Sequence, residues 1–138
     1  MNIEFNVIAA FHSNREHILM CKRRKNPYKG LYNLVGGKIE NGEDGLSAAY
    51  RELEEETGIS KNDIILTHLM DFTYYLHGIK VEVYVGRLNK EIAVYGDENE
   101  LEWVGLNQNF FDASRFAGEG NIGHIMEHIY LSKQILLK

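Results

Sequence analysis

The sequence predicts one α/β (α+β) domain, residues 1–138, in which helices pack on a mixed β-sheet. Three observations indicate this class. Segments with strand and helix patterning occur in the order ββ, loop, α, ββ, β, α, which implies a mixed sheet covered by helices. A length of 138 residues suits a single domain. A content of 44% hydrophobic and 25% charged residues is typical of a globular protein.

Two strands and a loop are predicted for the first part of the chain. Segments 3–11 and 17–22 have the apolar composition of strands, and the turn-prone residues His12 to Asn14 separate them. Segment 26–42 contains Pro27 and four glycines, so we expect mostly loop, with a short extended piece at 31–35.

A helix is predicted over 44–57, and Gly58 suits the left-handed position that follows a helix. At about 100° per residue, one face gathers the residues that we expect to pack on the sheet, namely Leu46, Ala49, Tyr50, Leu53 and Thr57. The other side carries Gly45, Ala48 and a stripe of glutamates.

The remaining elements are three strands and a helix. Segments 64–76 and 79–87 flank His77-Gly78, which is a hairpin signal. Valines alternate with other residues over 81–85, so one face of this strand should be buried. We expect a short strand at 102–105 and a helix over 121–136 with an apolar arc of isoleucines.

Composition argues against several classes of protein. With 20 acidic and 15 basic residues, the charge of −5 disfavours binding to nucleic-acid polymers, although small phosphate ligands that bring metal ions remain compatible. No apolar run approaches the roughly 18 residues that cross a bilayer. The N-terminus lacks the basic region of a secretory signal, and the single Cys21 suits a reducing compartment, so we expect a cytoplasmic protein. The sequence leaves a homodimer open.

Charge is strongly segregated along the chain. Residues 40–56 contain seven acids and one base, Arg51, whereas residues 22–29 contain five bases and no acid. Within the predicted helix, Glu52 and Glu56 are i,i+4 neighbours whose carboxylates repel by roughly 0.2–0.5 kcal/mol, and Arg51 can relieve only Glu55. A hard divalent cation such as Mg²⁺ would remove this repulsion. A solvated surface is the alternative interpretation.

The segment 37–59, GKIENGEDGLSAAYRELEEETGI, resembles the Nudix box, G-x5-E-x7-R-E-U-x-E-E-x-G-U, where U is aliphatic, at every specified position. Beyond the box the resemblance is looser and rests on the order of the elements. It implies a Nudix-type α/β/α sandwich with a mixed β-sheet. It also implies hydrolysis of a nucleoside diphosphate linked to another group, with Mg²⁺ or Mn²⁺ as cofactor.

The resemblance implies roles for residues of the box. Glu52 and Glu56 would be metal ligands, and Glu55 would be a further ligand or the base that activates water. Arg51 would orient a box glutamate, and the backbone of Gly37 would close the loop onto the metal. Glu43 would buttress that loop.

Two further roles fall outside the box. A carboxylate there commonly supplies a ligand or the general base in this family, and Glu98 is the first candidate, ahead of Glu100. Arg23 resembles the family's basic residue that meets substrate phosphate. Lys22 and Arg24 are its rivals, because only one strand parity can face the site.

The stretch 30–38 is similar to MutT-type enzymes, which cleave oxidised purine nucleoside triphosphates such as 8-oxo-dGTP to the monophosphate and pyrophosphate. The resemblance implies that Asn33 reads the base with its amide, and that Gly37 and Lys38 lie at the substrate. A structural loop role is the alternative for Asn33. The sequence departs from the commoner pattern by having Val35 where proline often precedes the two glycines.

Other substrates stay open. ADP-ribose hydrolases typically carry a proline downstream of the box, and no proline follows Pro27, which weighs against that substrate. Dinucleoside polyphosphate hydrolases carry a tyrosine at a distance beyond the box similar to that of Tyr75, so this substrate class stays open. Stacking on a base and packing in the core are both open to Tyr74 and Tyr75. A non-catalytic nucleotide-binding module would be expected to lose a box carboxylate, and this chain retains all three.

Two motifs near the end of the sequence are interpreted as coincidental. His124, Glu127 and His128 have the spacing of an inverted zinc-peptidase motif, but both histidines fall on the polar side of the last predicted helix. Residues 118–123 match G-x-G-x-x-G without the second half of a dinucleotide fold. We interpret them as a mobile loop at the start of that helix.

Overall fold

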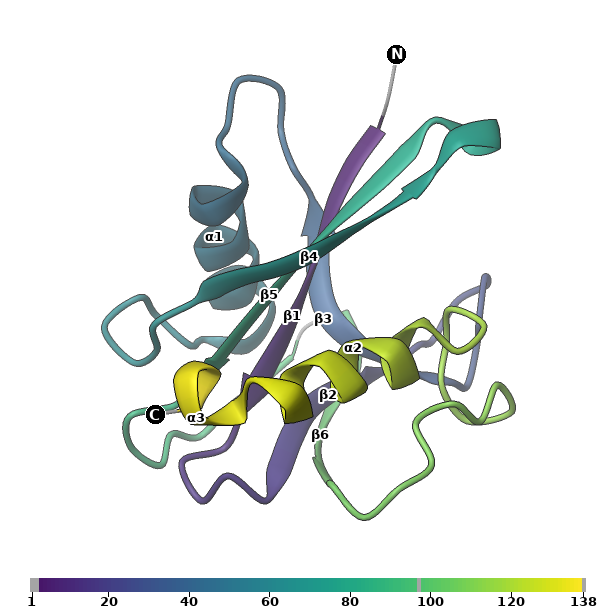
Figure 1. The fold of residues 1–138 in the computed structure, drawn as a ribbon. Helices are drawn as coiled ribbons and strands as arrows, with labels where there is room; N and C mark the ends of the chain where they lie inside the picture. Colours follow the sequence, from purple (N-terminus) through teal and green to yellow (C-terminus); the bar gives the residue numbers. More distant parts are fainter. Residues whose placement is uncertain (1–2, 97, 138) are drawn as a thin grey trace.

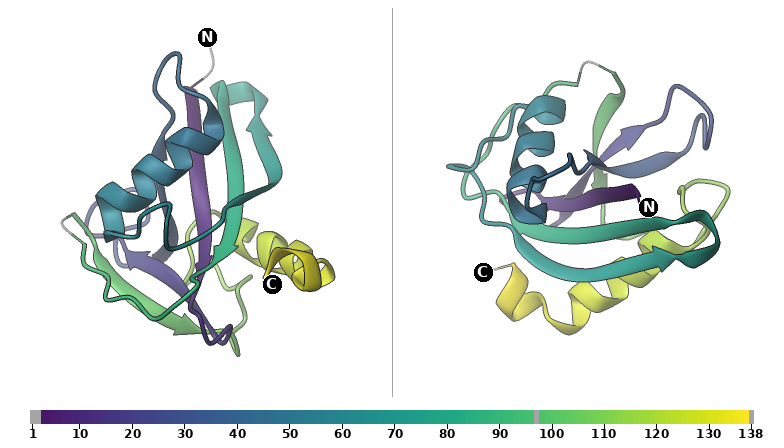
Figure 2. Two further views of the ribbon diagram at one scale, coloured as in Figure 1. Left: turned by 90° about the vertical axis from the view of Figure 1, so that its left-hand side faces the viewer. Right: turned by 90° about the horizontal axis from the view of Figure 1, so that it is seen from above.

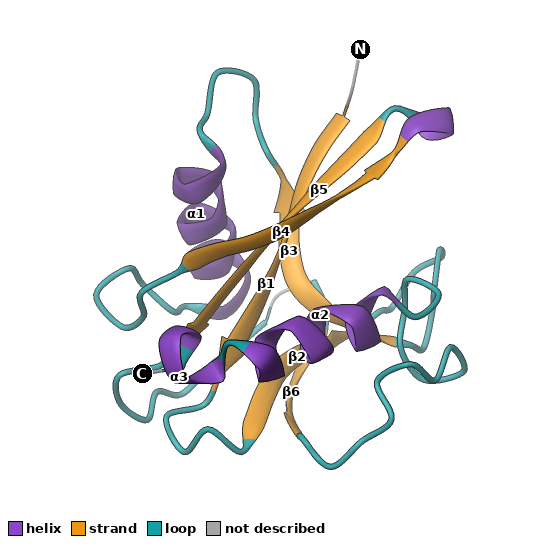
Figure 3. Ribbon diagram, in the orientation of Figure 1, coloured by secondary structure: helices purple, strands orange, loops and turns teal. Residues whose placement is uncertain are grey.

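Six strands form one mixed sheet with a helical layer on each face (Figures 1 and 3). The computed structural model describes residues 3–96 and 98–137. The strands are β1 (Ile3–Phe11), β2 (His17–Lys22), β3 (Tyr32–Lys38), β4 (Thr67–Tyr74), β5 (Ile79–Arg87) and β6 (Glu100–Gly105). The helices are α1 (Gly45–Thr57), the 3₁₀ turn η1 (Tyr75–His77), α2 (Asn121–Leu131) and α3 (Lys133–Leu136). The predicted α/β class and α/β/α sandwich are confirmed.

The sheet has the strand order β4-β5-β1-β3-β2-β6. Strand β1 pairs parallel with β5 and antiparallel with β3. The pairing places Asn6 beside Gly37 on one side and beside Glu82 on the other. Helix α1 covers one face of the sheet, and α2 and α3 cover the other (Figure 2). The centre of the sheet is therefore shielded on both sides.

Two hydrophobic clusters hold the layers together. Along β1, Ile8 and Ala10 face α1, whereas Ala9 and Phe11 face α2, because successive side chains of a strand point to opposite faces. All four are at most 1% exposed. A strand buried on both faces is apolar throughout rather than alternating, which explains the continuous run at the end of β1.

Both ends of α1 are capped: Gly58 ends the helix as predicted, whereas Asp44, predicted as its first residue, is the N-cap before it. The Asp44 carboxylate accepts the Ser47 N–H at 2.9 Å, which satisfies a donor that a helix start leaves unpaired. Gly58 follows the helix with φ of 83°, a conformation that glycine adopts without a steric penalty. Its N–H donates to the Glu54 carbonyl at 2.9 Å.

Two predicted details of α1 are wrong, and burial in β5 extends beyond the predicted face. Leu46, predicted to pack on the sheet, is 42% exposed, whereas Ala48, predicted on the other side of the helix, is buried. The reason is that the acidic side of α1 also contacts strands: a Cβ on Gly45 would lie 1.9 Å from the Glu82 carboxylate. In β5 the predicted burial of one face is confirmed at Val83 and Val85, and Tyr84 on the second face is buried as well, because α1 covers that face.

Two predicted boundaries also change. Strand β3 runs through Gly36 and Gly37 to Lys38, beyond the predicted end at residue 35. The C-terminal helix does not continue to residue 136, since α2 ends at Leu131 and α3 begins again after Ser132.

Replacing Leu53 by alanine tests the packing of α1 on the sheet. Leu53 is 0% exposed, so we expect Leu53→Ala to lower the free energy of unfolding by about 2–5 kcal/mol. The matched control Leu46→Ala, on the same helix but exposed, should change it by no more than about 0.5 kcal/mol. Urea unfolding followed by circular dichroism measures both. Equal losses would contradict the observed orientation of α1.

Candidate active site

The glutamates of α1 lie directly over the two glycines of β3. A Cβ added to Gly37 would lie 2.4 Å from the Glu52 carboxylate, and one added to Gly36 would lie 2.1 Å from the Asn6 carbonyl oxygen. A side chain at position 36 would clash with the backbone of β1, and one at position 37 would force the Glu52 carboxylate to move. The pair Gly36–Gly37, called the diglycine below, therefore allows helix and strand to approach closely at the acidic side of α1.

Besides the pairing of β3 with β1, three hydrogen bonds from side chains hold residues 36–38 in place, two of them to the diglycine. The Gly36 N–H donates to Glu56 Oε2 at 3.2 Å, and the Gly37 N–H donates to Asn6 Oδ1 at 3.1 Å. The next residue, Lys38, accepts Arg51 Nη2 at its carbonyl at 3.1 Å. Because glycine has the most conformational freedom of any residue, these bonds determine how its backbone is presented.

Arg51 ties the loop before α1 to the carboxylates of the helix. Its guanidinium forms two hydrogen bonds to Glu43, at 2.7 and 2.9 Å. Its Nη1 contacts Glu52 at 2.9 Å and Glu55 at 3.2 Å. The pKa of Glu43 falls to about 2, chiefly because Arg51 hydrogen-bonds to its ionised form. Arg51 thus offsets the negative charge of three glutamates, whereas the sequence predicted that it would offset the charge of Glu55 alone.

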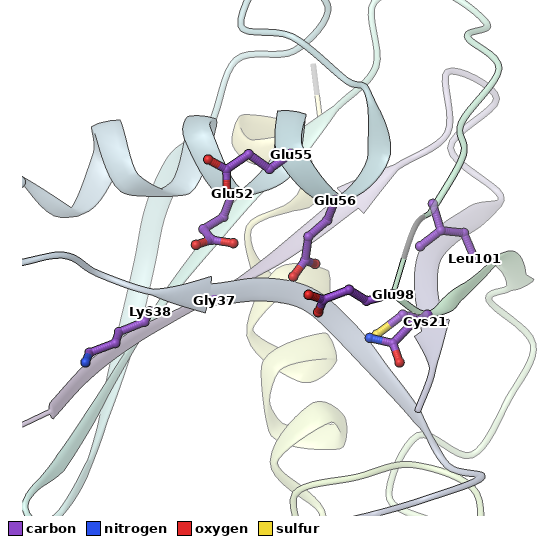
Figure 4. A pocket seen from close by; sticks show the side chains of 9 residues that line it. Cys21, Gly37, Lys38, Glu52, Glu55, Glu56, Glu98 and Leu101 are labelled. Atoms are coloured by element: carbon purple, nitrogen blue, oxygen red, sulfur yellow. The ribbon is translucent and has the colours of Figure 1, made fainter. Parts of the chain in front are cut away.

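The carboxylates line a pocket of about 410 Å³ between α1, β3 and the segment before β6 (Figure 4). We call it the carboxylate pocket. It is lined by Cys21, Gly37, Lys38, Glu52, Glu55, Glu56, Glu98, Asn99 and Leu101. In Figure 4 Glu52 and Glu56 project from α1 toward the strand that carries Gly37, Glu55 lies beside the helix above Glu52, and the Glu98 carboxylate lies next to that of Glu56.

Of the two candidates outside the box, the fold brings only Glu98 into this pocket. Leu101 of β6 packs on the α1 side of the sheet. Its neighbours Glu100 and Glu102 have the opposite parity, and Glu102 accepts the Tyr32 hydroxyl on the α2 side.

Burial and neighbouring negative charges make it costly to ionise the carboxyl groups in this pocket. The pKa of Glu56 rises to about 7, first because the group is withdrawn from water and then because of Glu52, Glu98 and Glu55. The Gly36 N–H opposes this rise. The pKa of Glu52 is also raised, mainly by burial. Burial next to Glu56 raises the pKa of the Cys21 thiol to about 11, so that it stays neutral.

The donor set suits a hard divalent cation. Carboxylate oxygens and backbone carbonyls are the ligands of Mg²⁺ and Mn²⁺, and a cation would offset the repulsion that raises the Glu56 pKa. Within residues 3–96 and 98–137, no three His, Cys, Asp or Glu side chains converge closely enough to form a ready-made metal site. Arg51 holds Glu52 and Glu55, and Gly36 holds Glu56, which explains this spread.

The residues predicted to contact substrate are not all in the carboxylate pocket. Lys38 lines it, whereas Arg23 does not, because Arg23 Nε donates to the Pro27 carbonyl at 2.7 Å within its own loop. Asn33 lines a separate cavity of about 130 Å³ on the α2 side, here called the apolar pocket. Its Oδ1 accepts the Leu34 N–H at 2.9 Å.

The apolar pocket contains polar groups that the sequence did not reveal. Its walls come from β1, β3, β4, β5 and the start of α2, and they include Phe72, Tyr74, Ile122 and Asn121. The amide of Asn121 donates to the Tyr74 hydroxyl. Tyr28 lies at the same cavity and donates to the Glu119 carboxylate at 2.6 Å. Tyr28 and Glu119 are 91 positions apart in the sequence, and Tyr74 and Asn121 are 47 positions apart. No local sequence pattern could therefore connect them.

The two coincidental motifs have structural roles. His124 and His128 are exposed on α2, and the described part of the chain contains no three-residue metal cluster that includes them. Gly118 and Gly120 have φ values of 88° and 92° and form the turn that leads into α2. No helix in the described ranges is long and apolar enough to span a membrane.

The structure is an α/β/α sandwich in which helix α1 holds glutamates over the diglycine of β3. The family model described as the NUDIX domain matches residues 4–126. The chain therefore belongs to the Nudix family.

Relatives of this chain carry several activities in their names. An ADP-ribose pyrophosphatase of Methanocaldococcus jannaschii is 33% identical over 93 residues, which are 65% of this chain and 55% of that protein. An RNA pyrophosphohydrolase of Pelagibacter ubique is 38% identical over 38% of this chain and 33% of its own length. The mouse 8-oxo-dGDP phosphatase NUDT18 is 33% identical over 42% of this chain and 18% of its own length. The chain thus spans about half, or less, of these relatives.

Solved structures support the fold. A structure of MutT from a study of Aliivibrio salmonicida and Vibrio cholerae aligns with a TM-score of 0.73 and 22% identity, over 95% of this chain and 99% of that one. The Ap4A hydrolase of Caenorhabditis elegans aligns with a TM-score of 0.73 and 19% identity, over 94% and 98% of the two chains.

Replacing Glu56 by glutamine should raise stability when no metal is present. The folded pKa of about 7 exceeds the ordinary 4.5, so wild-type stability falls as pH rises from 4.5 through 7 and stays lower above it. Glutamine removes this dependence and can still accept the Gly36 N–H. We expect the Tm of Glu56→Gln at pH 8 in EDTA to exceed that of wild type by a few degrees, and the difference to vanish near pH 4.5.

The control for this prediction is Glu54→Gln, which removes an exposed carboxylate from the same helix. Its Tm should follow wild type at every pH. A Glu56→Gln variant that is less stable than wild type at pH 8 would contradict the unfavourable ionisation of Glu56.

Proposed function

We propose that this protein is a divalent-metal-dependent Nudix pyrophosphohydrolase. Its substrate would be a nucleoside triphosphate, cleaved to the monophosphate and pyrophosphate, with oxidised purines such as 8-oxo-dGTP as the preferred class. The observation that carries the proposal is the set of glutamates that α1 holds against the diglycine in a 410 Å³ pocket. Retention of every box carboxylate favours catalysis over a purely binding role.

In this proposal the α1 glutamates hold Mg²⁺ or Mn²⁺. Glu52, Glu56 and the backbone of Gly37 are the proposed ligands, with Glu55 as a further ligand or base. When bound, the metal neutralises the diphosphate and lowers the pKa of attacking water. Arg51 keeps Glu52 and Glu55 oriented through the hydrogen bonds described above.

Glu98 is the proposed carboxylate from outside the box. It is exposed, whereas Glu56 is largely enclosed, and both line the same pocket. An exposed carboxylate can reach a water molecule that enters with the substrate. Lys38 at the rim, and Arg23 once released from Pro27, are the proposed cations for substrate phosphate.

The apolar pocket is the proposed site of the base. It combines aromatic walls with the amides of Asn33 and Asn121, which together offer donors and acceptors to a purine edge. The relative named as an 8-oxo-dGDP phosphatase supports an oxidised purine. The relative named as an ADP-ribose pyrophosphatase covers more of the chain and supports ADP-ribose as the second candidate.

The proposed partner is a small nucleotide, and the proposed location is the cytoplasm. The single Cys21 is buried with its thiol free, which suits a reducing compartment.

A hydrolysis screen tests the proposed activity. With Mg²⁺, we expect the wild-type protein to release pyrophosphate from nucleoside triphosphates, and fastest from 8-oxo-dGTP. Glu56→Gln should lower kcat by ~10²-fold or more, within the usual range for losing a group that assists proton transfer or holds the metal, whereas the control Glu54→Gln should retain it. Faster turnover of ADP-ribose or a dinucleoside polyphosphate would contradict the substrate. Nucleotide binding without any turnover would contradict the enzyme.

The base pocket is tested by Asn33→Ala and Asn121→Ala. Both side chains line the apolar pocket and lie away from the carboxylates. We therefore expect a higher KM for 8-oxo-dGTP, by about 5- to 10-fold for the loss of one hydrogen bond to the base, with little change in kcat. A fall in kcat at constant KM would place the base elsewhere.

A further inference from the structure

Asn6 is a polar residue in an otherwise apolar stretch of β1. It is 1% exposed, and it is one of two buried polar residues in the described chain, with Thr57 as the other. Thr57 is fully used, because its hydroxyl donates to the Leu53 carbonyl at 2.6 Å and accepts the Ile59 N–H at 3.1 Å. Asn6 is different: its Nδ2 has no hydrogen-bond partner among the described residues.

The orientation of the Asn6 amide is determined by its neighbour. Oδ1 accepts the Gly37 N–H at 3.1 Å, so turning the amide over would place two donors against each other. Nδ2 must then remain the unpaired end. A buried donor without a partner costs stability. Folding alone would favour an apolar side chain at this position, as at Ile8 and Ala10 further along the same face of β1.

What Asn6 does provide is an acceptor for the diglycine. Of the three hydrogen bonds at residues 36–38, one comes from Glu56 and one from Arg51, and both of these side chains belong to α1. From the sheet side, the backbone pairing of β1 with β3 aligns the strand, and Asn6 is the one side chain among the described residues that hydrogen-bonds to the diglycine independently of α1. It acts at Gly37, the residue whose Cα lies against the Glu52 carboxylate.

We propose that Asn6 is a positioning residue for the metal site, which rests on the proposed function above. By fixing the Gly37 N–H, Asn6 fixes the backbone that the Glu52 carboxylate packs on, and so presents both to the cation. Glu56 and Arg51 differ from Asn6 in that both belong to α1, the helix that carries the proposed ligands. The unpaired Nδ2 is the cost of placing an acceptor there.

The test compares Asn6→Leu with Asn6→Asp in the full chain. Leucine has a similar size but offers no acceptor, whereas aspartate retains an oxygen for the Gly37 N–H. Mn²⁺ affinity is measured from the electron paramagnetic resonance signal of the free ion, and the Gly37 N–H is followed by amide hydrogen exchange without metal. Ile8→Val, on the same face of β1, is the control for a general loss of stability.

We expect Asn6→Leu to weaken Mn²⁺ binding by about tenfold and to accelerate exchange at Gly37. Asn6→Asp should bind within about threefold of wild type, and Ile8→Val should leave both measurements unchanged. Should Asn6→Leu fail to fold, loss of Mn²⁺ binding in folded Asn6→Asp with Gly37 still protected would overturn the proposal.

Two further results would also count against it, and they are distinguishable. Unchanged Mn²⁺ affinity in folded Asn6→Leu, with normal binding by wild type, would overturn the role of Asn6 alone. Absence of Mn²⁺ binding by wild type would overturn the proposed function and this inference together.

Discussion

The contact between the Glu52 carboxylate and the Cα of Gly37 is the constraint on which the site depends. It depends on glycine at position 37, because a Cβ there would lie 2.4 Å from the Glu52 carboxylate and would displace it. It also brings the acidic side of α1, rather than only its apolar face, onto the sheet. The exposed Leu46 and the buried Ala48 follow from this rotation. Close packing at one point thus decides which residues of the helix reach the pocket.

This arrangement places charge where folding alone would avoid it. Glu56 is enclosed next to Glu52 and Glu98, and its pKa of about 7 reflects the cost. Arg51 offsets part of it by holding Glu43, Glu52 and Glu55 together. Carboxylates that are buried close to one another in this way are typical of functional sites. It explains why a cation in the carboxylate pocket would stabilise the protein as well as supply chemistry.

The sequence predicted the elements better than their junctions. Apolar strands, the glycine that ends α1 and the box spacing are local signals, and each led to a correct element. The sequence predicts a loop at the diglycine, because glycine usually interrupts strands. In the structure the two glycines belong to a strand and allow it to contact a helix. Asn6 carried a visible signal, a polar residue within an apolar strand, but its partner Gly37 lies 31 positions away. The apolar pocket, likewise, is assembled from distant segments that no periodicity connects.

The position at which a divalent cation binds is the most informative measurement on the carboxylate pocket. Substoichiometric Mn²⁺ broadens the resonances of nearby backbone amides, so that a titration followed by nuclear magnetic resonance identifies the site without assuming any substrate. We expect the amides of Gly36, Gly37 and Glu56 to broaden at the lowest Mn²⁺ concentration. Broadening that begins at another group of acids, such as Asp71 and Glu82 beside Lys80, with the diglycine unaffected, would contradict the proposed metal site.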